Sequence, residues 1–274
     1  MVSSAEASAP PPDLTGELEV VGRISGSSNL AVLARVLPSS AHERPDIHVI
    51  YKPVQGEKPL WDFPDGTLAG REVAAAVVSE LGGWDLVPTT LLRDGPLGPG
   101  SVQLWVGDPY EPLPDDRVVD LVPEGRVPRG WHEVLDGETP GGRSVTVVHS
   151  DAADVRSLAV LDAAINNSDR KGTHCLRDRD GRLWGIDHGV SFSAEPKLRT
   201  VLWGWAGERL PTAELARLER LGAALRTADA VTRLGSLLPE QDLLALVRRV
   251  DRLLKVGEHP RPASGWPAVP WPPL

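Results

Sequence analysis

The sequence predicts an α+β protein: a small antiparallel β-rich lobe that carries one helix, followed by a mainly helical lobe. Two patterns along the chain indicate this arrangement. In the first part, short runs of β-branched residues alternate with turn residues, and one segment has helical spacing. In the second part, longer segments place apolar residues at intervals of three and four. With 274 residues, of which 41% are hydrophobic, the chain is long enough to bury a core.

Four segments are expected from composition. Residues 1–14 are rich in Ala, Ser and Pro and predict a flexible tail, and residues 259–274 predict an irregular tail rich in Pro and Trp. Between the tails, residues 15–107 are expected to form the β-rich lobe and residues 108–258 the helical lobe. The stretch Pro109–Arg143 is rich in Pro, Gly and Asp, so we expect a connector and an irregular insertion there.

The β-rich lobe is expected to contain five strands and one helix. The first two strands flank a turn of small residues, Gly22-Arg23-Ile24-Ser25-Gly26-Ser27-Ser28. The helix, Thr67–Leu81, has a broad apolar face and ends at Gly82-Gly83. The predicted strands are Glu17–Ile24, Asn29–Leu37, Ile47–Lys52, Leu86–Leu92 and Ser101–Val106.

The helical lobe is expected to begin with a helix over Asp151–Asn166, with Ser150 or Asp151 as its N-cap. Asp162 interrupts the apolar stripe of this helix, and we expect it to bond to the loop that follows. A strand pair is expected next, around an Asp-Gly turn, and two amphipathic helices after it. The strands are Cys175–Arg177 and Leu183–Ile186, and the helices are Ala213–Leu225 and Glu240–Leu254.

Composition excludes several classes of protein. The net charge of -9 argues against a nucleic-acid binder, and no cluster of Lys and Arg suggests docking on anionic lipid. Cys175 is the single cysteine, which excludes an internal disulfide and a cysteine-based zinc site. The first residues do not read as a secretory signal, and no apolar run approaches the roughly 20 residues of a membrane span. We therefore expect a cytoplasmic protein with no transmembrane segment; the pattern does not indicate an oligomeric state.

Two acidic residues on neighbouring loops carry the functional prediction. Asp169 follows the predicted helix in a polar loop, where a carboxylate is placed to accept or orient the proton of an acceptor hydroxyl. Arg170 or Lys171 beside it would offset charge on a moving phosphoryl group. Asp187 ends the short strand before Gly189, where its hard oxygens suit Mg²⁺. Each residue taken singly also fits a solvated turn or a capping Asp, but both together predict phosphoryl transfer from ATP.

Residues in the β-rich lobe complete this prediction. The small-residue turn would lay backbone N–H groups over the phosphates of ATP, at Gly22, Ser25, Gly26 and Ser27. Lys52 ends the third strand and would reach the phosphates, held by an ion pair with Glu72 on the following helix. The alternative is a solvated Lys and a surface Glu, and the sequence does not decide where Glu72 points.

The order of these motifs resembles the protein-kinase-like fold, in particular the phosphatidylinositol 3-/4-kinase superfamily and its bacterial relatives. In that family the catalytic loop reads Asp-Arg, with an Asn five residues after the Asp, and a later Asp-x-Gly holds metal. Asp169-Arg170 and Asp187-His188-Gly189 match these two motifs. Glu72-Val73-Ala74-Ala75 and Leu86-Val87-Pro88-Thr89-Thr90 also resemble the family's helix and the Val-Pro strand after it.

The resemblance spans about residues 20–195. It implies a two-lobe fold that binds ATP with Mg²⁺ (or Mn²⁺) between the lobes. It also implies a hinge near Gln103–Gly107, with Gln103 at the nucleotide. One position departs from the pattern, because His174 stands where the family has its metal-binding Asn.

The departure at His174 leaves several possibilities for the metal. A neutral imidazole can ligate a divalent ion, although it suits Zn²⁺ and other transition metals better than Mg²⁺. His174 and Asp187 are therefore the expected ligands. The alternatives are that Asn166 or Asn167 takes the place of the missing Asn, or that one metal site is lost.

Three functional hypotheses follow. The first is an ATP-dependent phosphotransferase whose acceptor is the hydroxyl of a lipid, a protein or a small molecule. The second is a nucleotide-binding pseudokinase that acts by docking a partner, favoured by the change at His174. The third is a metal hydrolase built from His174, Asp187 and His188, which lacks the paired His-Glu-x-x-His spacing typical of such enzymes.

Overall fold

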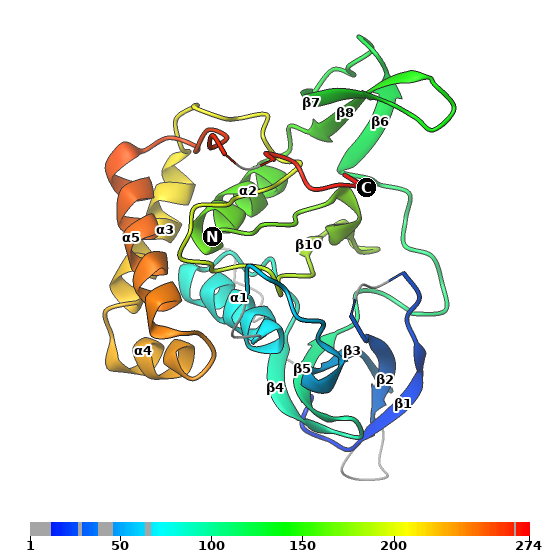
Figure 1. Ribbon diagram of the computed structural model, residues 1–274, viewed down its shortest axis with the longest axis vertical. Helices are drawn as coiled ribbons and strands as arrows, with labels where there is room; N and C mark the ends of the chain where they lie inside the picture. The colour runs from blue at the N-terminus through cyan, green and yellow to red at the C-terminus, as the bar shows by residue number, and fades with distance from the viewer. Residues whose placement is uncertain (1–11, 27–28, 38–45, 64–66, 266) are drawn as a thin grey trace, which may run out of the picture.

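The structure is a computed structural model that describes residues 12–26, 29–37, 46–63, 67–265 and 267–274. In these residues the chain forms five α-helices and three antiparallel sheets, which confirms the predicted α+β class. Figure 1 shows a five-stranded sheet and a three-stranded sheet at opposite ends of the molecule, with the helices between and beside them. The predicted Ser27 and most of the N-terminal tail lie outside the described residues.

The first sheet contains the five strands that the sequence predicts, in the order β1-β2-β3-β5-β4. Its fourth strand begins later than the predicted Leu86–Leu92, because Pro88 has no N–H to donate to a neighbouring strand. Alternate residues of the inner strands are buried in a small core that includes Val49, Tyr51 and Val102. The strands are β1 (Leu18–Arg23), β2 (Val32–Val36), β3 (Ile47–Pro53), β4 (Thr90–Gly95) and β5 (Gly98–Leu104).

Helix α1 (Leu68–Gly82) joins this sheet to the rest of the molecule. It ends at Gly83, whose φ of 73° lies in the left-handed region that favours glycine, as the sequence predicts. The helix packs against β4 and β5 on one side and against a C-terminal helix, α3 (Thr212–Ala224), on the other. Its apolar residues therefore belong to the larger core, although the sequence assigned this helix to the β-rich lobe.

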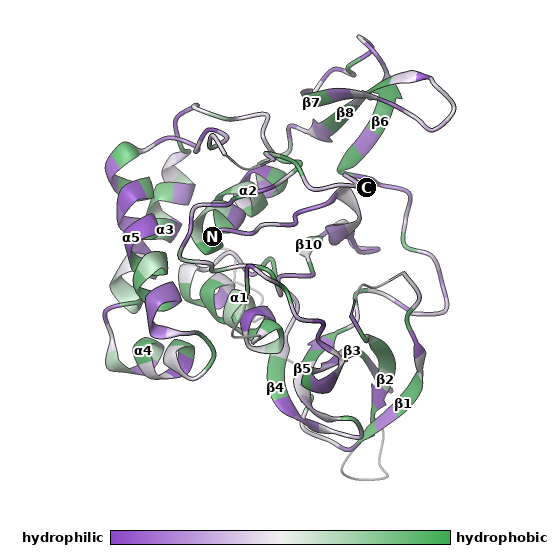
Figure 2. Ribbon diagram, in the orientation of Figure 1, coloured by the Kyte–Doolittle hydropathy of each residue, from purple (hydrophilic) through white to green (hydrophobic). Residues whose placement is uncertain are grey.

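The predicted irregular insertion is wrong. The residues that follow the connector form a three-stranded antiparallel sheet in the order β6-β8-β7, with β6 (Val119–Pro123), β7 (Trp131–Glu138) and β8 (Ser144–Ser150). Figure 2 shows polar and apolar residues interleaved along these strands. The apolar signal of β6 and β7 is weak because much of each is solvent-exposed, and Pro and Gly in the turns dominate the composition.

The remaining elements largely follow the prediction. They are α2 (Ala153–Ile165), β9 (Cys175–Arg177), β10 (Leu183–Gly185), α3, an unpredicted short helix α4 (Ala228–Gly235), and α5 (Glu240–Val256). The predicted N-cap of α2 is wrong. Ala152 occupies the cap position without a side-chain bond, and Asp151 instead accepts a hydrogen bond from Trp205 Nε1 at 2.9 Å. In the described part of the chain, no helix is long and apolar enough to cross a membrane.

The segment after α5 is irregular and lies against the body of the molecule (Figure 1). The Ala268 carbonyl accepts hydrogen bonds from Thr200 N at 3.1 Å and from Trp203 Nε1 at 2.8 Å. The Pro273 carbonyl accepts one from Gly172 N at 2.8 Å. This segment therefore supports two loops that follow α2.

A cluster of aromatic rings joins the three-stranded sheet to this segment. The rings of His149 and Trp205 are 4.6 Å apart between centroids, and His259 stacks on the other side of Trp205 at 5.9 Å. Gly204 approaches so closely that a Cβ there would lie 2.6 Å from His149 Nε2, so only glycine fits. Gly204 N donates to His149 Nε2 and Arg156 Nε donates to His259 Nε2. Both imidazoles are therefore held in the neutral form.

We expect this cluster to make stability depend on acid pH. Burial lowers the pKa of His149 and of His259 to about 4, whereas an unfolded histidine titrates near 6.5. Between these values the unfolded chain binds protons that the folded protein does not, so the free energy of unfolding falls as pH drops from 6.5 to 4. The loss is about 3 kcal/mol for each ring at most. Urea unfolding across this range measures it.

A His149→Gln variant tests whether His149 contributes to this pH dependence. Glutamine keeps one donor and one acceptor but does not titrate, so the variant should lose the part of the pH dependence that comes from His149. A variant profile that superimposes on the wild-type profile would exclude His149 as a source of the effect.

Candidate functional site

A cleft of about 880 Å³ lies between the five-stranded sheet and the larger part of the molecule. Both sides contribute to its walls. One end is mainly apolar and is lined by the end of β5 and the residues that follow it, from Gln103 to Val106. The apolar residues of this end are Ile24, Ala31, Ile50, Leu104, Leu113, Leu176 and Ile186. A flat apolar ring fits such an end, as in many nucleotide and cofactor sites.

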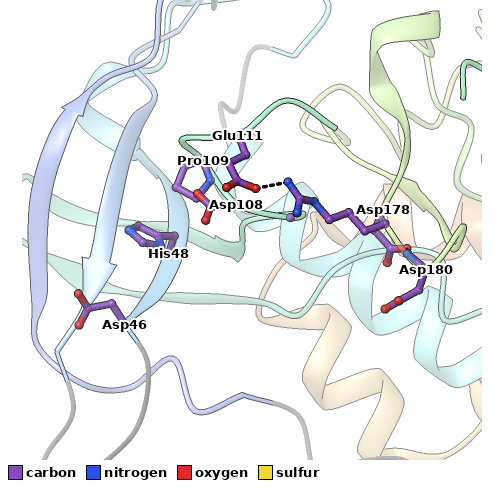
Figure 3. Close-up of a pocket in the computed structure, with 9 residues that line it drawn as sticks. Asp46, His48, Asp108, Pro109, Glu111, Asp178 and Asp180 are labelled. Carbon is purple, nitrogen blue, oxygen red and sulfur yellow. Dashed lines mark hydrogen bonds and ion pairs between the residues drawn. The ribbon is translucent and has the colours of Figure 1, made fainter. Parts of the chain in front are cut away.

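A smaller hollow of about 610 Å³ lies beside the segment that follows β5 and is strongly acidic (Figure 3). Arg179, which is part of its lining, pairs with Glu111. The remaining carboxylates in its lining are Asp46, Asp108, Asp178 and Asp180. Because like charges repel, this hollow does not suit the phosphates of a nucleotide.

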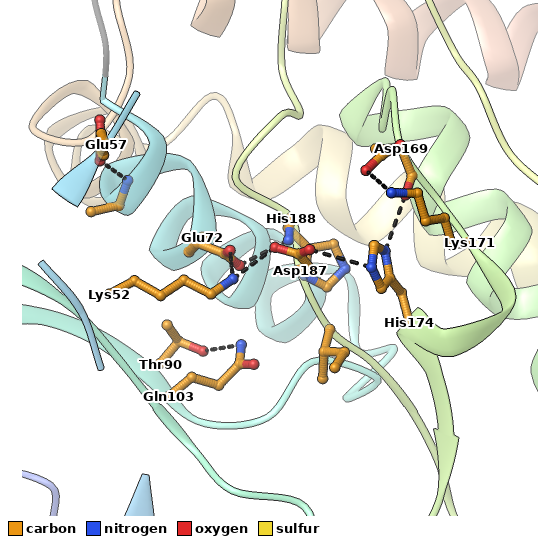
Figure 4. A network of polar contacts seen from close by, with 12 residues as sticks. Lys52, Glu57, Glu72, Thr90, Gln103, Asp169, Lys171, His174, Asp187 and His188 are labelled. Carbon is orange, nitrogen blue, oxygen red and sulfur yellow. Dashed lines mark hydrogen bonds and ion pairs between the residues drawn. The ribbon is translucent and has the colours of Figure 1, made fainter. Parts of the chain in front are cut away.

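Lys52 lies at the centre of the larger cleft (Figure 4). It is the penultimate residue of β3, and its Nζ donates to Glu72 on α1 and to Asp187 Oδ1 at 2.7 Å. Burial opposes the charge on Lys52, but the carboxylates of Asp187 and Glu72 outweigh burial and raise the pKa of its amine. Lys52 therefore stays cationic and joins three separate elements at one point.

Glu72 is buried, which settles the orientation that the sequence left open. One of its oxygens accepts from Lys52, and the other accepts from the backbone N–H of His188 at 2.8 Å. Burial raises the pKa of the Glu72 carboxyl, against the opposing effect of Lys52. This glutamate holds both the lysine and the backbone just after Asp187.

Asp187 follows β10 in a backbone conformation that is rare for its residue type. Its φ is 60°, in the left-handed region, which costs on the order of 1–3 kcal/mol when the surroundings enforce it. The positive charge of Lys52 holds the pKa of its carboxyl far below the usual range. The strained backbone directs a permanently ionised carboxylate into the cleft, where it is one of the lining residues.

Asp169 lies in the loop after α2 and also lines the cleft (Figure 4). Its carboxylate pairs with Lys171 Nζ at 3.1 Å, and its N–H donates to Asn167 Oδ1 at 3.0 Å. Asn167 in turn donates to Asp162, which confirms that Asp162 bonds to the following loop. The loop is thus fixed from below by buried side chains, while Asp169 and Lys171 remain accessible.

Arg170 does not take the role that the sequence suggested. Its side chain is fully buried and is not among the residues that line the cleft. It forms two hydrogen bonds with Asp162, at 2.8 and 2.9 Å, and donates to the carbonyls of His174 and Ile186. A guanidinium engaged in this way stabilises the two acidic loops and cannot contact a phosphoryl group. Of the two cations proposed, Lys171 is the one in the cleft.

His174 lies between the two acidic residues. Its Nδ1 is 3.1 Å from the Asp169 carbonyl oxygen, and its Nε2 is 3.3 Å from Asp187 Oδ2. A carbonyl oxygen only accepts, so Nδ1 carries the proton and, in the neutral ring, Nε2 presents a lone pair. Burial lowers the pKa of this imidazole, against the effect of Asp187, and so favours the neutral ring. Two lone pairs, from His174 and Asp187, then face one another.

The alternative metal ligands that the sequence offered are engaged elsewhere in the protein. Asn166 donates to the carbonyl of Ser193 at 2.9 Å and Asn167 donates to Asp162, so both amides are engaged within the protein. His188 is buried, and its Nε2 lies 2.7 Å from Arg170 Nη2, so it faces away from the cleft. The described residues gather no set of three or more His, Cys, Asp or Glu side chains that suits a metal. The three-residue hydrolase site is therefore wrong.

The predicted phosphate-binding turn is only partly in the cleft. Ser25 and Gly26 line it, and Gly26 has a φ of 84°. Gly22 lies within β1 at a register shift and is not in the lining. Gln103 lines the cleft from β5, and its amide donates to Thr90 Oγ1 at 2.8 Å.

Sequence reasoning missed one part of the cleft. Lys58, Trp61 and Arg199 also line it, beyond Lys52 and Asp187. No local motif marks these residues. Arg199 lies in a later loop and reaches the cleft only because that loop pairs with the Asp169 loop. Arg199 N donates to Asn167 O at 3.0 Å and Arg170 N donates to Arg199 O at 3.1 Å.

The fold and the cleft together define an α+β protein in which two acidic loops and a β-sheet lysine meet in one cavity. Comparison with known proteins adds a relative. Protein Rv2133c of Mycobacterium tuberculosis is 45% identical over 262 residues, which cover 94% of this chain and 92% of the relative. The chain therefore belongs to the family of Protein Rv2133c. No protein-family model matches it.

Proposed function

We propose that the protein is an ATP-dependent phosphotransferase with a two-lobe, protein-kinase-like fold and a chemistry like that of the phosphatidylinositol 3-/4-kinases. The apolar end of the cleft would take the adenine, and Lys52 would contact the phosphates. The acceptor hydroxyl would lie at Asp169. In the reaction the bond from Pγ to ADP breaks and a bond forms between the acceptor oxygen and phosphorus, while the hydroxyl proton passes to the Asp169 carboxylate.

A single observation carries this proposal: Lys52 contacts both Glu72 and Asp187 in the same cleft that Asp169 lines. Phosphoryl transfer requires little covalent chemistry from the protein, so positioned charges supply most of the catalysis. A cation for the phosphates and a carboxylate for a metal lie next to each other here. The second carboxylate, for the acceptor, belongs to Asp169, whose backbone carbonyl is linked to Asp187 through the His174 ring (Figure 4).

The donor set at His174 and Asp187 fits a divalent cation. The His174 lone pair and the Asp187 oxygen, 3.3 Å apart, repel unless a proton or a cation lies between them. When bound, such an ion would neutralise charge on the phosphates of ATP. Two protein ligands are sufficient because phosphate oxygens and water complete the coordination of a nucleotide-bound ion. Imidazole nitrogen favours Mn²⁺ and later transition metals over Mg²⁺.

We expect His174 to coordinate Mn²⁺ through its Nε2 nitrogen. Electron spin-echo measurements on Mn²⁺ bound with the β,γ-imido analogue of ATP should detect this nitrogen. Labelling the protein with ¹⁵N distinguishes the imidazole from nitrogens of the adenine. In a His174→Asn variant the signal should vanish while Mn²⁺ still binds, and turnover with Mg²⁺ should be equal to wild type or higher. If Mn²⁺ binds to the wild type but the spectrum shows no coupling to a protein nitrogen, His174 is excluded as a ligand.

Incubation with γ-labelled ATP and Mg²⁺ or Mn²⁺ tests the proposed function directly. We expect label to appear in inorganic phosphate, in the protein itself or in an acceptor from a cell extract. Nucleotide binding without any of these products would favour the alternative function, a pseudokinase that acts by docking a partner. Failure to bind ATP under either metal would exclude both.

A further inference from the structure

The Lys52–Asp187 pair divides the cleft into two ends with different chemistry. Figure 4 shows Gln103 on one side of this pair and Glu57, Asp169 and Lys171 on the other. The end that contains Gln103 is mainly apolar. The charged residues and the tryptophan grouped here as the acceptor end are Glu57, Lys58, Trp61, Asp62, Asp169, Lys171 and Arg199.

The carboxylates of the acceptor end already have partners. Glu57 accepts hydrogen bonds from the N–H groups of Leu68 and Ala69, at the start of α1. Asp62 pairs with Lys197 Nζ at 3.2 Å. Asp169 pairs with Lys171 at 3.1 Å. Asp62 and Asp169 are therefore paired with lysines, and Glu57 is engaged by backbone donors.

Two cations of the acceptor end remain uncompensated. Within the part of the chain that the structure describes, neither Arg199 nor Lys58 forms an ion pair, and Nε of Arg199 is buried without a hydrogen-bond partner. A buried N–H without an acceptor costs about 1–3 kcal/mol in most proteins. In a chain with a net charge of -9, unpaired cations inside a cleft are unexpected unless an anion binds there.

Arg199 is also fixed in position relative to Asp169. Its backbone N–H and carbonyl bond to Asn167 and Arg170, the residues on either side of Ser168 and Asp169. The backbone of Arg199 is therefore held against the Asp169 loop, and both residues line the same cleft. Its planar fork of donors matches a phosphate or carboxylate group better than any neutral partner.

From these contacts we infer that the acceptor is an alcohol that already carries a phosphate or carboxylate group, and that Arg199, assisted by Lys58, binds this group. The inference rests on the proposed phosphotransferase function and names its substrate class. Arg199 and Lys58 determine specificity here and do not contact the transferred phosphoryl group. Trp61, which is 78% exposed at this end, offers a flat apolar surface for the carbon skeleton of the acceptor.

The test measures the binding of inorganic phosphate by titration calorimetry. The protein is first saturated with Mn²⁺ and the β,γ-imido analogue of ATP. The analogue fills the γ-phosphate position, so phosphate cannot bind at Lys52. We expect saturable binding that weakens at least tenfold in Arg199→Met, and less in Lys58→Met because Lys58 is exposed. Arg117→Met removes an equal charge from an exposed position outside the cleft and should leave binding unchanged.

Two results would overturn the inference: no phosphate binding to the analogue-saturated protein, or equal binding in wild type and Arg199→Met. If Arg199→Met does not fold, Arg199→Lys decides in its place, because it keeps the charge but loses the fork and should still weaken binding. Failure of the analogue itself to bind counts against the proposed function and is therefore a separate outcome. Inositol 1-phosphate and phosphatidylcholine vesicles containing phosphatidylinositol then distinguish a free metabolite from a lipid headgroup as the source of the anion.

Discussion

Replacement of Asp169 by Asn is expected to lower phosphoryl transfer by about 10²–10⁴-fold while leaving the affinity for ATP unchanged. The asparagine amide keeps the size of the side chain but cannot take the proton of the acceptor hydroxyl. Asp169 is bound to the protein mainly through Lys171 and through its own backbone, so the substitution leaves the buried network around Asp162 intact. The measurement is the turnover of γ-labelled ATP at saturating nucleotide.

Asp180→Asn is the matched control for this prediction, because Asp180 is an exposed carboxylate in the turn between β9 and β10, outside the large cleft. Its turnover should equal that of the wild type. Unchanged turnover in Asp169→Asn would remove Asp169 from the reaction.

Replacement of Asp187 by Ala is expected to abolish the metal-dependent part of nucleotide binding. The substitution removes the ionised oxygen that faces His174, whereas Lys52 keeps its contact with Glu72 and can still reach a phosphate. In a thermal-shift titration, ATP with Mg²⁺ or Mn²⁺ should therefore stabilise the variant no more than ATP alone. The wild type should gain further stability from the metal because an ion that binds only the folded protein raises its melting temperature.

Asp187→Asn separates the loss of charge from a change in the backbone. Asparagine tolerates the left-handed conformation at this position better than alanine does, and it keeps one neutral oxygen. We expect an intermediate shift from this variant. A metal-dependent shift of wild-type size in Asp187→Ala would show that the ion, if present, is held elsewhere.

Local sequence patterns predicted most elements of the fold. The strands of the first sheet, helix α1 and its glycine end, and the β9–β10 hairpin all have signals within a few residues of one another. The sheet of β6, β7 and β8 was missed because β6 and β7 are half-exposed and the turns resemble an irregular loop. The start of β4 was misplaced because Val87-Pro88 resembles a strand in composition but cannot pair as one.

In the site, the sequence identified the residues of the motifs, but it did not indicate the direction in which their side chains point. Asp169 and Arg170 are adjacent in the same loop, yet one lines the cleft and the other is fully buried. The difference follows from Asp162, which lies in α2 eight residues before Arg170 and whose buried carboxylate requires a cationic partner. No rule of spacing indicates which of two neighbouring cations fills that need.

The types of residue and their order along the chain were determined by the sequence alone: a strand-end lysine, a helical glutamate, and two acidic loops joined by a hairpin. Tertiary structure decided the rest, because the decisive contacts join residues far apart. Lys52 and Asp187 are separated by 135 positions, and Arg199 enters the cleft only because its loop pairs with the Asp169 loop. Charge compensation depends on distance in space. Only the folded chain therefore reveals which cations have a carboxylate beside them and which do not.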